Sequence, residues 1–379
     1  MKIAIVDTYY LKFLAAYYRA HPNLKFASYQ EQLEALLGAS FGTSNFYSSH
    51  LKSLNVEAID IIANCRPLQR AWMLEAGLKN GLLDFIIPYQ LYKTPMIGSI
   101  FSTISPGFLR VITEQIKFYS PDVLYCQDIN FFPEESLREL KKHVGLIVGQ
   151  IASPLPPTAF LKNYDLILTS FPHFVNRIRE MGINSEYFRI GFETKILDQI
   201  KAVKKNIDVS FVGGLGSKHS NSIELLEYLA KHTPIKFFGY GVNKLSRYSP
   251  IRLKHYGERW GIEMYKTLAS SFITVNRHIN VAENYANNMR LYEATGVGAL
   301  LVTDAKENLG DLFEVGKEVL AYSDKYEAAE LINYHLAHPE VASEIAKLGS
   351  RRTLSDHTYL NRMYELKNLL IQYLSNPKC

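Results

Sequence analysis

The chain has 379 residues, which is enough for two domains of ordinary size, each with its own hydrophobic core. Hydrophobic residues make up 47% of it, as in a globular protein, and its net charge of +5 comes without long Lys/Arg tracts. This mild positive charge argues against a nucleic-acid partner, while it suits anionic ligands and a weak peripheral association with a membrane surface. The three cysteines, Cys65, Cys126 and Cys379, form no metal-ligand spacing, and their odd number argues against a disulfide framework.

Short apolar runs alternate with longer amphipathic stretches along most of the chain, a pattern that predicts repeated βα units with parallel sheets. The first run, in Met1–Asp7, is far shorter than a signal sequence or a membrane span, and no later run approaches roughly 18 residues. We therefore expect a soluble, cytoplasmic protein. The predicted strands are Ile3–Val6, Ala58–Ala63, Val123–Cys126, Leu146–Ile151, Leu166–Thr169, Val209–Val212, Ile235–Phe238, Phe272–Val275 and Ala299–Thr303.

The first five strands predict one sheet and the last four a second, so we expect an α/β protein with two Rossmann-like domains facing a central cleft. The expected domains are residues 1–190 and 191–355, with residues 356–379 forming a C-terminal helix. A hinge between the domains would let them close over a ligand. Irregular loops are expected at Phe41–Ser53 and Pro88–Pro106, where Gly, Ser, Thr and Pro concentrate.

Three polar residues of the first domain follow predicted strands and are candidate catalytic residues. Asp7 comes directly after the first strand, Asp128 follows the third, and His173 follows the fifth. Because the carboxyl ends of parallel strands face the ligand crevice in α/β proteins, either aspartate could act as a base or orient an acceptor hydroxyl. The alternative for each aspartate is a capping role at the next helix or loop, and for the histidine a structural role.

A glycine-rich segment, Phe211–Asn221, follows the first strand of the second domain. Its glycines, Gly214 among them, permit close backbone approach, so Lys218 and His219 could meet a diphosphate. The segment matches neither Gly-x-Gly-x-x-Gly nor a Walker loop, and an ordinary βα turn is the alternative. The turn Phe237–Gly241 has the same two interpretations, a contact to a base or a plain strand-to-loop turn.

The stretch from Val275 to Asp304 reads as a strand end, a polar loop, a short helix and another buried strand. Asn287 and Asn288 are plausible capping residues for that helix, so free N–H groups near Met289 and the helix dipole would form an anion site.

Arg290 and Glu293 lie on one face of this helix, above the anion site. A phosphate at the base and a carboxylate above it, able to accept two hydroxyl protons from a ribose, would suit a nucleotide. A simple Arg–Glu surface pair is the alternative. Gly296 and Gly298 are expected to end the helix.

Several metal and cofactor signatures are absent from the sequence. There is no Asp-x-Asp, His-Glu-x-x-His, Gly-x-Ser-x-Gly or Cys/His cluster. We therefore expect no metal and no cofactor, with phosphate held by helix dipoles and cations.

Spaced elements from about Asp208 to Arg362 resemble one known family. They are Asn288-x-Arg290-x-x-Glu293-Ala-x-x-x-Gly298-x-Leu-Leu-x-Thr303-Asp304, then Phe313–Lys317, then His357-Thr-Tyr-x-x-Arg362. This order resembles the CgeB-like branch of the group 1 glycosyltransferases, which have the GT-B fold. The resemblance implies a nucleotide-sugar donor held by the second domain and an acceptor held by the first. It also implies that Glu293 holds the ribose, that Asn287–Met289 and Arg290 hold the diphosphate, and that no metal is required.

The resemblance leaves the stereochemistry open, because retaining members commonly carry a second glutamate where this chain has Tyr285. A retaining enzyme would use Lys218 and Arg290 to offset charge on the leaving diphosphate, whereas an inverting one would need a base such as Asp7 or Asp128. The expected function is transfer of a sugar to a glycan, lipid-linked or protein acceptor. The alternatives are a GT-B epimerase or hydrolase, and a non-catalytic nucleotide-sugar-binding module.

Overall fold

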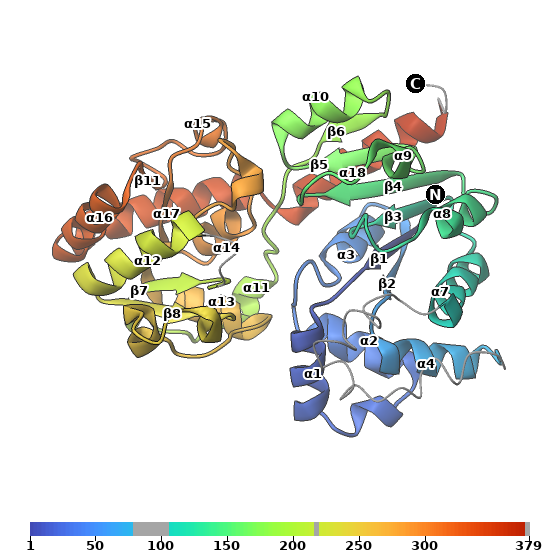
Figure 1. Cartoon of the computed structure of the whole chain (residues 1–379), viewed down its shortest axis with the longest axis horizontal. Coiled ribbons are helices and arrows are strands. Elements are labelled where there is room, and N and C mark those ends of the chain that lie inside the picture. Colours follow the sequence, from blue (N-terminus) through green and yellow to red (C-terminus); the bar gives the residue numbers. More distant parts are fainter. Residues whose placement is uncertain (79–105, 216–219, 376–379) are drawn as a thin grey trace. The chain divides into compact units, whose positions relative to one another are not determined.

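A computed structural model describes residues 1–78, 106–215 and 220–375 (Figure 1). The chain divides into two compact units. Unit 1 comprises Met1–Thr169, His173–Tyr187 and Tyr364–Cys379, and unit 2 comprises Ser170–Pro172 and Phe188–Met363. In the part of the chain that the structure describes, no helix is both long and apolar enough to span a bilayer.

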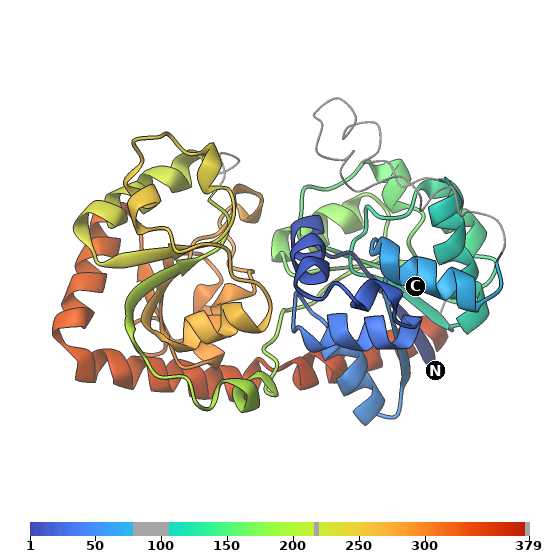
Figure 2. The same ribbon diagram turned by 90° about the horizontal axis from the view of Figure 1, so that it is seen from below.

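The sheet of unit 1 has six strands in the order β2-β1-β3-β4-β5-β6, and all neighbours are parallel. Its central strands are buried apolar runs, as expected where helices cover both faces of a parallel sheet (Figures 1 and 2). The five predicted strands are confirmed, whereas β6 is short and polar and was not predicted. The strands are β1 (Lys2–Asp7), β2 (Glu57–Ile62), β3 (Val123–Cys126), β4 (Leu146–Ile151), β5 (Leu166–Thr169) and β6 (Ser185–Tyr187).

The helices of unit 1 connect these strands in repeated βα units. They are α1 (Leu11–Ala20), the 3-10 turn η1 (Leu24–Phe26), α2 (Tyr29–Gly38), α3 (Phe46–Ser53), α4 (Arg66–Glu75), α7 (Pro106–Tyr119), α8 (Glu134–Leu140), α9 (Thr158–Leu161) and α10 (Pro172–Glu180). The loop predicted at Phe41–Ser53 is wrong in its second part, because α3 occupies it. Phe46, Tyr47 and Leu51 are buried there, and tertiary burial outweighs the serine-rich composition. Pro88–Pro106 lies outside the described residues except for its last residue, where α7 begins.

The sheet of unit 2 has five strands in the order β11-β10-β9-β7-β8, again with parallel neighbours. The four predicted strands are confirmed, and a short edge strand, β11, was not predicted. One core cluster joins Val209, Ile273 and Leu300 of the strands to residues of α12, α16 and α17. The strands are β7 (Ile207–Val212), β8 (Ile235–Phe238), β9 (Ser271–Val275), β10 (Leu300–Asp304) and β11 (Leu320–Tyr322).

Helices also lie on both faces of this second sheet (Figure 2). They are α11 (Ile196–Ile200), α12 (Ser220–His232), α13 (Ile262–Ala269), α14 (Arg290–Gly296), α15 (Leu309–Leu312), α16 (Lys325–Ala337) and α17 (Pro339–Asp356), with the 3-10 turns η4 (Val242–Lys244), η5 (Pro250–Lys254) and η6 (Asn280–Ala282). The last helix, α18 (Tyr359–Ser375), contributes residues to both units. Within unit 1, Lys367 Nζ of α18 donates to Leu54 O at 2.9 Å, and Tyr373 OH donates to Glu186 at 3.1 Å.

The His357-Thr-Tyr segment has a structural role at the start of α18. Phe192 N donates to His357 O at 2.8 Å, and Tyr359 N donates to Phe192 O at 2.9 Å, so the segment forms a short parallel bridge within unit 2. The Phe192 ring lies so close to Gly296 that a Cβ there would be 2.5 Å from it, which explains the need for glycine. Burial lowers the pKa of His357 to about 4, and its Nε2 lies 2.8 Å from Leu312 O.

Candidate functional site

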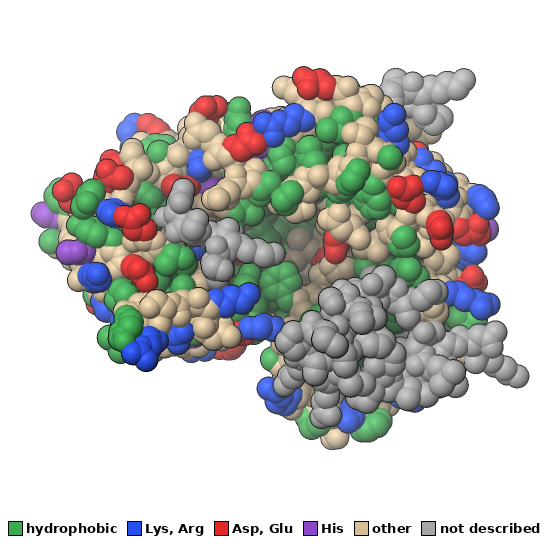
Figure 3. Space-filling view, in the orientation of Figure 1, with side chains coloured by type: hydrophobic (Ala, Val, Ile, Leu, Met, Phe, Trp, Pro, Cys, Tyr) green, Lys and Arg blue, Asp and Glu red, His purple; other side chains and the backbone are tan. Residues whose placement is uncertain are grey.

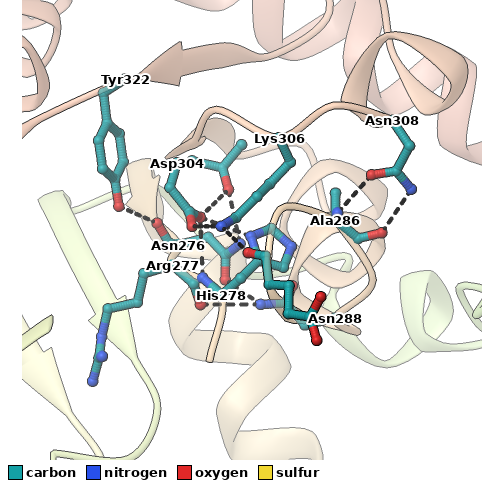
Figure 4. Close-up of polar contacts among 11 residues, drawn as sticks. Asn276, Arg277, His278, Ala286, Asn288, Asp304, Lys306, Asn308 and Tyr322 are labelled. Carbon is teal, nitrogen blue, oxygen red and sulfur yellow. Dashed lines mark hydrogen bonds and ion pairs between the residues drawn. The ribbon is translucent and has the colours of Figure 1, made fainter. Parts of the chain in front are cut away.

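The carboxyl edge of the second sheet carries a dense polar cluster. The strand β9 ends at Val275 and is followed by Asn276, Arg277 and His278, while the neighbouring β10 ends at Asp304. Because these strands are parallel and adjacent, their polar ends meet at one edge (Figure 4). Ligands of α/β proteins bind at such an edge, so this cluster, the unit 2 edge, is the first place to look for a site.

Asn276 connects three segments at the unit 2 edge. Its Nδ2 donates to Thr303 Oγ1 at 2.9 Å, and its Oδ1 accepts from Asn288 Nδ2 at 2.9 Å. Its backbone oxygen accepts from Tyr322 OH at 2.8 Å (Figure 4). These bonds hold the loop after β9 against β10, β11 and the segment before α14, so the edge is rigidly positioned.

His278 and Asp304 form an ion-pair network beside this connection. Asp304 Oδ1 accepts from the backbone N of His278 at 3.0 Å and lies 2.7 Å from its Nδ1, and Lys306 Nζ is 3.3 Å from Asp304 Oδ2. Burial alone would raise the pKa of Asp304, but the contacts from His278 and Lys306 hold it below its usual value. Lys306 also donates to Glu283 O at 2.8 Å, which ties the loop before α14 to β10.

The predicted capping role of Asn287 and Asn288 is wrong. The helix α14 begins at Arg290, Met289 occupies the N-cap position, and no side chain caps the helix. Asn288 Nδ2 instead donates to Asn276 and to the backbone oxygen of Arg277, while Asn287 Nδ2 donates to Ser170 Oγ at 3.2 Å. Tertiary partners therefore take both amides, a competition that local sequence does not reveal.

Arg290 and Glu293 lie on one face of α14 as expected, and the helix ends at Gly296. Arg290 Nη1 is 2.7 Å from Glu293 Oε2, and the carboxylate is buried, with 5% of the residue exposed. Among the described residues, the other carboxylate oxygen, Oε1, accepts only a long bond of 3.5 Å from Tyr265 OH. The two residues thus form a buried pair rather than a surface pair, and Oε1 retains capacity to accept hydrogen bonds.

The glycine-rich loop after β7 is held against the loop after β8. Gly213 N donates to Phe238 O at 2.9 Å, and Leu215 N donates to Tyr240 O at 2.8 Å. The loops are so close that a Cβ on Gly239 would lie 1.9 Å from Gly213 O, so the Phe237–Gly241 turn needs its glycine for packing. Gly214 lies in this loop, whereas the candidate residues Lys218 and His219 lie outside the described residues.

Arg277 is a residue of the unit 2 edge that the sequence reasoning missed. It is 8% exposed, its guanidinium lies 5.5 Å from the centroid of the Phe211 ring, and Nη2 donates to Gly214 O at 3.2 Å. Nε and Nη1 have no hydrogen-bond partner among the described residues, and burial lowers the pKa of the guanidinium to about 10. The signal that could have found it is the rule that selected Asp7, a charged residue just after a buried strand.

In unit 1 the structure brings Asp7 and Asp128 to the same sheet edge, the unit 1 edge. Thr8 links them, since its backbone N donates to Asp7 Oδ1 at 2.7 Å and its Oγ1 donates to Asp128 Oδ2 at 2.8 Å. Burial, with the nearby Asp128 charge, raises the pKa of Asp7 to about 7. Neither aspartate caps a helix, because no side chain caps α1 or α8. Both accept from the backbone of the following loop, Asp7 from Thr8 N and Asp128 from Asn130 N, so the loop-capping alternative is confirmed.

Two further residues at the unit 1 edge were missed. Thr43 Oγ1 donates to Gln127 Oε1 at 2.9 Å and lies 3.5 Å from Asp7 Oδ2.

His173 lies in the first turn of α10, edge-on to the Phe174 ring at 4.8 Å, and no hydrogen bond between described residues joins it to either aspartate. The structure therefore joins the two aspartates through Thr8, and His173 is not part of that hydrogen-bonded group.

No cluster of three or more His, Cys, Asp or Glu side chains with the geometry of a metal site occurs among residues 1–78, 106–215 and 220–375. On the face shown in Figure 3, positive and negative side chains are interspersed over the part that the structure describes.

Residues 220–368 match a family model described as glycosyl transferase-like. No curated protein sequence matches the chain. Among solved structures, it is similar to sucrose-phosphate synthase from Thermosynechococcus elongatus, with 13% identity over 99% of both chains and a TM-score of 0.58. It is also similar to HepE from Anabaena in complex with UDP-glucose (11% identity, 98% of this chain and 100% of that chain, TM-score 0.55) and to AviGT4, a glycosyltransferase of avilamycin A biosynthesis (13% identity, 99% and 98%, TM-score 0.56).

These findings define the class of protein. The chain has the GT-B fold, built from two Rossmann-like units with parallel sheets. Residues 220–368, which match the glycosyl transferase-like family model, contain the unit 2 edge described above.

Proposed function

We propose that this protein is a glycosyltransferase of the CgeB-like branch, which moves a sugar from a nucleotide-diphosphate donor to a glycan, lipid-linked or protein acceptor. In this proposal unit 2 binds the donor and unit 1 binds the acceptor. The reaction needs no metal and retains the configuration of the sugar.

The observation that carries the proposal is the buried carboxylate of Glu293 inside the glycosyltransferase domain. Arg290 holds Oε2 at 2.7 Å, which fixes the rotamer of the carboxylate, while in the described part of the chain Oε1 has only the long contact to Tyr265. A carboxylate oxygen held in place with spare lone pairs suits a ribose diol, because each hydroxyl is a donor. Glu293 is therefore proposed to bind the donor ribose.

The solved structures support a donor of the nucleotide-sugar class. HepE, which shares the fold of this chain, was determined in complex with UDP-glucose and also with UDP and glucose. The likeness between the two chains is one of fold. Because HepE binds UDP compounds on this fold, we rank UDP first among the nucleotides to test.

The chemistry on the donor side follows from charge. Departure of the nucleotide diphosphate leaves negative charge on its outer phosphate, and a preorganised cation lowers the cost of that charge. Arg290 is proposed to serve in this way, together with Lys218. Tyr285 stands where a second glutamate is common in retaining members, so the retaining course is tested directly by determining the anomeric configuration of the product by NMR.

On the acceptor side, Asp7 and Asp128 are proposed to orient the attacking hydroxyl. With its pKa raised to about 7, the Asp7 carboxylate is a better proton acceptor near neutral pH than an ordinary aspartate. An inverting enzyme would use the same group as its base, so both courses place Asp7 at the acceptor.

The test is a thermal-shift screen against UDP, GDP, CDP, dTDP and ADP, run on the wild type, on Glu293→Gln and on Glu330→Gln. Glu330 is an exposed residue of α16 and serves as the matched carboxylate control. A ligand that binds only the native state raises its melting temperature, so we expect one nucleotide to stabilise the wild type and the control but to stabilise Glu293→Gln less. An equal shift in all three proteins would contradict the role of Glu293.

Product analysis separates the alternatives. A transferase consumes the nucleotide sugar faster when an acceptor is present, whereas an epimerase or hydrolase turns over without one. A binding module would show a thermal shift with no turnover. Addition of EDTA is expected to leave the rate unchanged, and a loss restored by a divalent ion would overturn the metal-independent part of the proposal.

A further inference from the structure

The guanidinium of Arg277 is a buried charge with unfilled hydrogen-bonding capacity. Only 8% of the residue is exposed, yet Nε and Nη1 have no partner among the described residues. The charge of Asp304 acts on the guanidinium at a distance, but this carboxylate is already engaged by His278 and Lys306. A buried charge without a counterion is costly, and it persists only where something else compensates for it.

The surroundings of Arg277 hold the guanidinium in place. Its plane is attracted to the Phe211 ring, and Nη2 is anchored on Gly214 O. Figure 4 shows the side chain extending away from the Asn276, His278 and Asp304 cluster. The end of the side chain is therefore fixed beside a glycine pair, Gly213–Gly214, at the carboxyl ends of parallel strands, where an anion can approach the backbone closely.

We propose that Arg277 binds the diphosphate of the donor, in addition to the cations proposed for it above. Nε and Nη1 do not share one edge of the guanidinium plane, so a single carboxylate would not satisfy both. A diphosphate presents oxygens on two phosphorus atoms and suits donors that point in different directions. This inference rests on the proposed function for the nucleotide part of the ligand, while the anion-binding role of Arg277 can be tested separately.

The experiment measures binding of nucleoside diphosphate, nucleoside monophosphate and inorganic pyrophosphate by calorimetric titration. The proteins are the wild type, Arg277→Met, Arg277→Lys and Arg351→Met. The nucleoside is the one whose diphosphate gives the largest thermal shift. Methionine preserves the length and the packing on Phe211 without the charge. Arg351 is an exposed residue of α17 and controls for the loss of one positive charge.

We expect Arg277→Met to weaken diphosphate binding about 10- to 100-fold, the usual worth of hydrogen bonds to a charged group. The preference for diphosphate over monophosphate should fall with it, pyrophosphate binding should weaken in parallel, and Arg277→Lys should restore part of the affinity. Arg351→Met should bind like the wild type. Arg277→Met removes a buried charge that has no counterion, so without ligand this variant should melt no lower than the wild type. If Arg277 had only a structural role, the substitution would lower the melting temperature.

Three other outcomes would contradict one or both of the proposals. Unchanged diphosphate and pyrophosphate affinity in Arg277→Met overturns the role of Arg277 and leaves the proposed function standing. Pyrophosphate binding that depends on Arg277, with no binding of any nucleotide, upholds the anion site and overturns the nucleotide-sugar donor. If neither pyrophosphate nor any nucleotide binds the folded wild type, both proposals fall.

Discussion

The two sheets end in polar edges of opposite character. At the unit 1 edge, Asp7 and Asp128 share Thr8 as a donor, and burial raises the pKa of Asp7. At the unit 2 edge, the buried Arg277 retains unfilled donors, and Arg290 pairs with Glu293. One architecture thus presents proton-accepting groups in one unit and anion-accepting groups in the other.

The two edges have the same topology, so the difference in their chemistry comes from the side chains that line them. Both edges lie at the carboxyl ends of parallel strands, where ligands of α/β proteins bind. Carboxylates suit a hydroxyl acceptor and cations suit a phosphorylated donor, so the charge at each edge supports the assignment of acceptor to unit 1 and donor to unit 2. Four predictions test this contrast.

The largest expected effect is on the stability of unit 2. Arg290→Met leaves Glu293 buried without its partner, which should cost about 3 to 5 kcal/mol in the free energy of unfolding. Trp72 lies in unit 1 and Trp260 in unit 2, so urea unfolding followed by fluorescence in a Trp72→Phe background reports on unit 2. The double variant with Glu293→Gln should recover most of the loss. A single variant as stable as its parent would show that the pair is not structural.

The next effect is on turnover and tests the unit 1 edge. Asp7→Asn should lower kcat about 10- to 100-fold through loss of a hydrogen bond to a charged group, with little change in donor affinity. Because the carboxylate must be ionised, wild-type turnover should rise through about pH 7 and the variant should lose this rise. The control is Asp198→Asn, which changes an exposed carboxylate of α11. A variant with wild-type rate and pH profile would remove Asp7 from the acceptor site.

The same aspartate should make the stability of unit 1 depend on pH. The pKa of Asp7 is about 7 in the folded state, above its ordinary value of 3.8, so the folded state binds more protons between these values. Stability from this group therefore falls as pH rises from about 4 to about 7 and is constant above that. The stability difference between Asp7→Asn and the wild type should therefore shift in favour of the variant by about 4 kcal/mol between pH 4 and pH 8. Urea unfolding at the two pH values in a Trp260→Phe background measures it. A gain that does not change with pH would mean that the carboxyl group ionises normally.

The smallest effects compare one threonine from each edge. Thr8→Val removes the hydroxyl that donates to Asp128, and Thr303→Val removes the hydroxyl that accepts from Asn276. Each should lower the free energy of unfolding of its own unit by about 1 kcal/mol, because a buried polar partner is left unsatisfied. Melting followed by each tryptophan in turn separates the units, and a loss in the opposite unit would contradict this local interpretation.

The candidate site was predictable in part. Asp7, Arg290 and Glu293 could be chosen because a position after a buried strand or on one helix face follows from spacing alone. The roles of Asn287 and Asn288 could not, because their amides bind partners distant in sequence rather than the adjacent helix. The rule that selected Asp7 would also have selected Arg277, which follows β9 directly. Its burial could not be predicted, because it comes from the packing of Phe211 and Gly214 around the guanidinium.

The sequence by itself determined the βα order and nine of the strands, since apolar runs of strand length reflect burial on both faces of a parallel sheet. Only the tertiary structure decided the short edge strands β6 and β11, the helix α3, and the pairing of polar groups at each edge. These depend on long-range contacts, which supply burial and hydrogen-bond partners that local propensity does not contain.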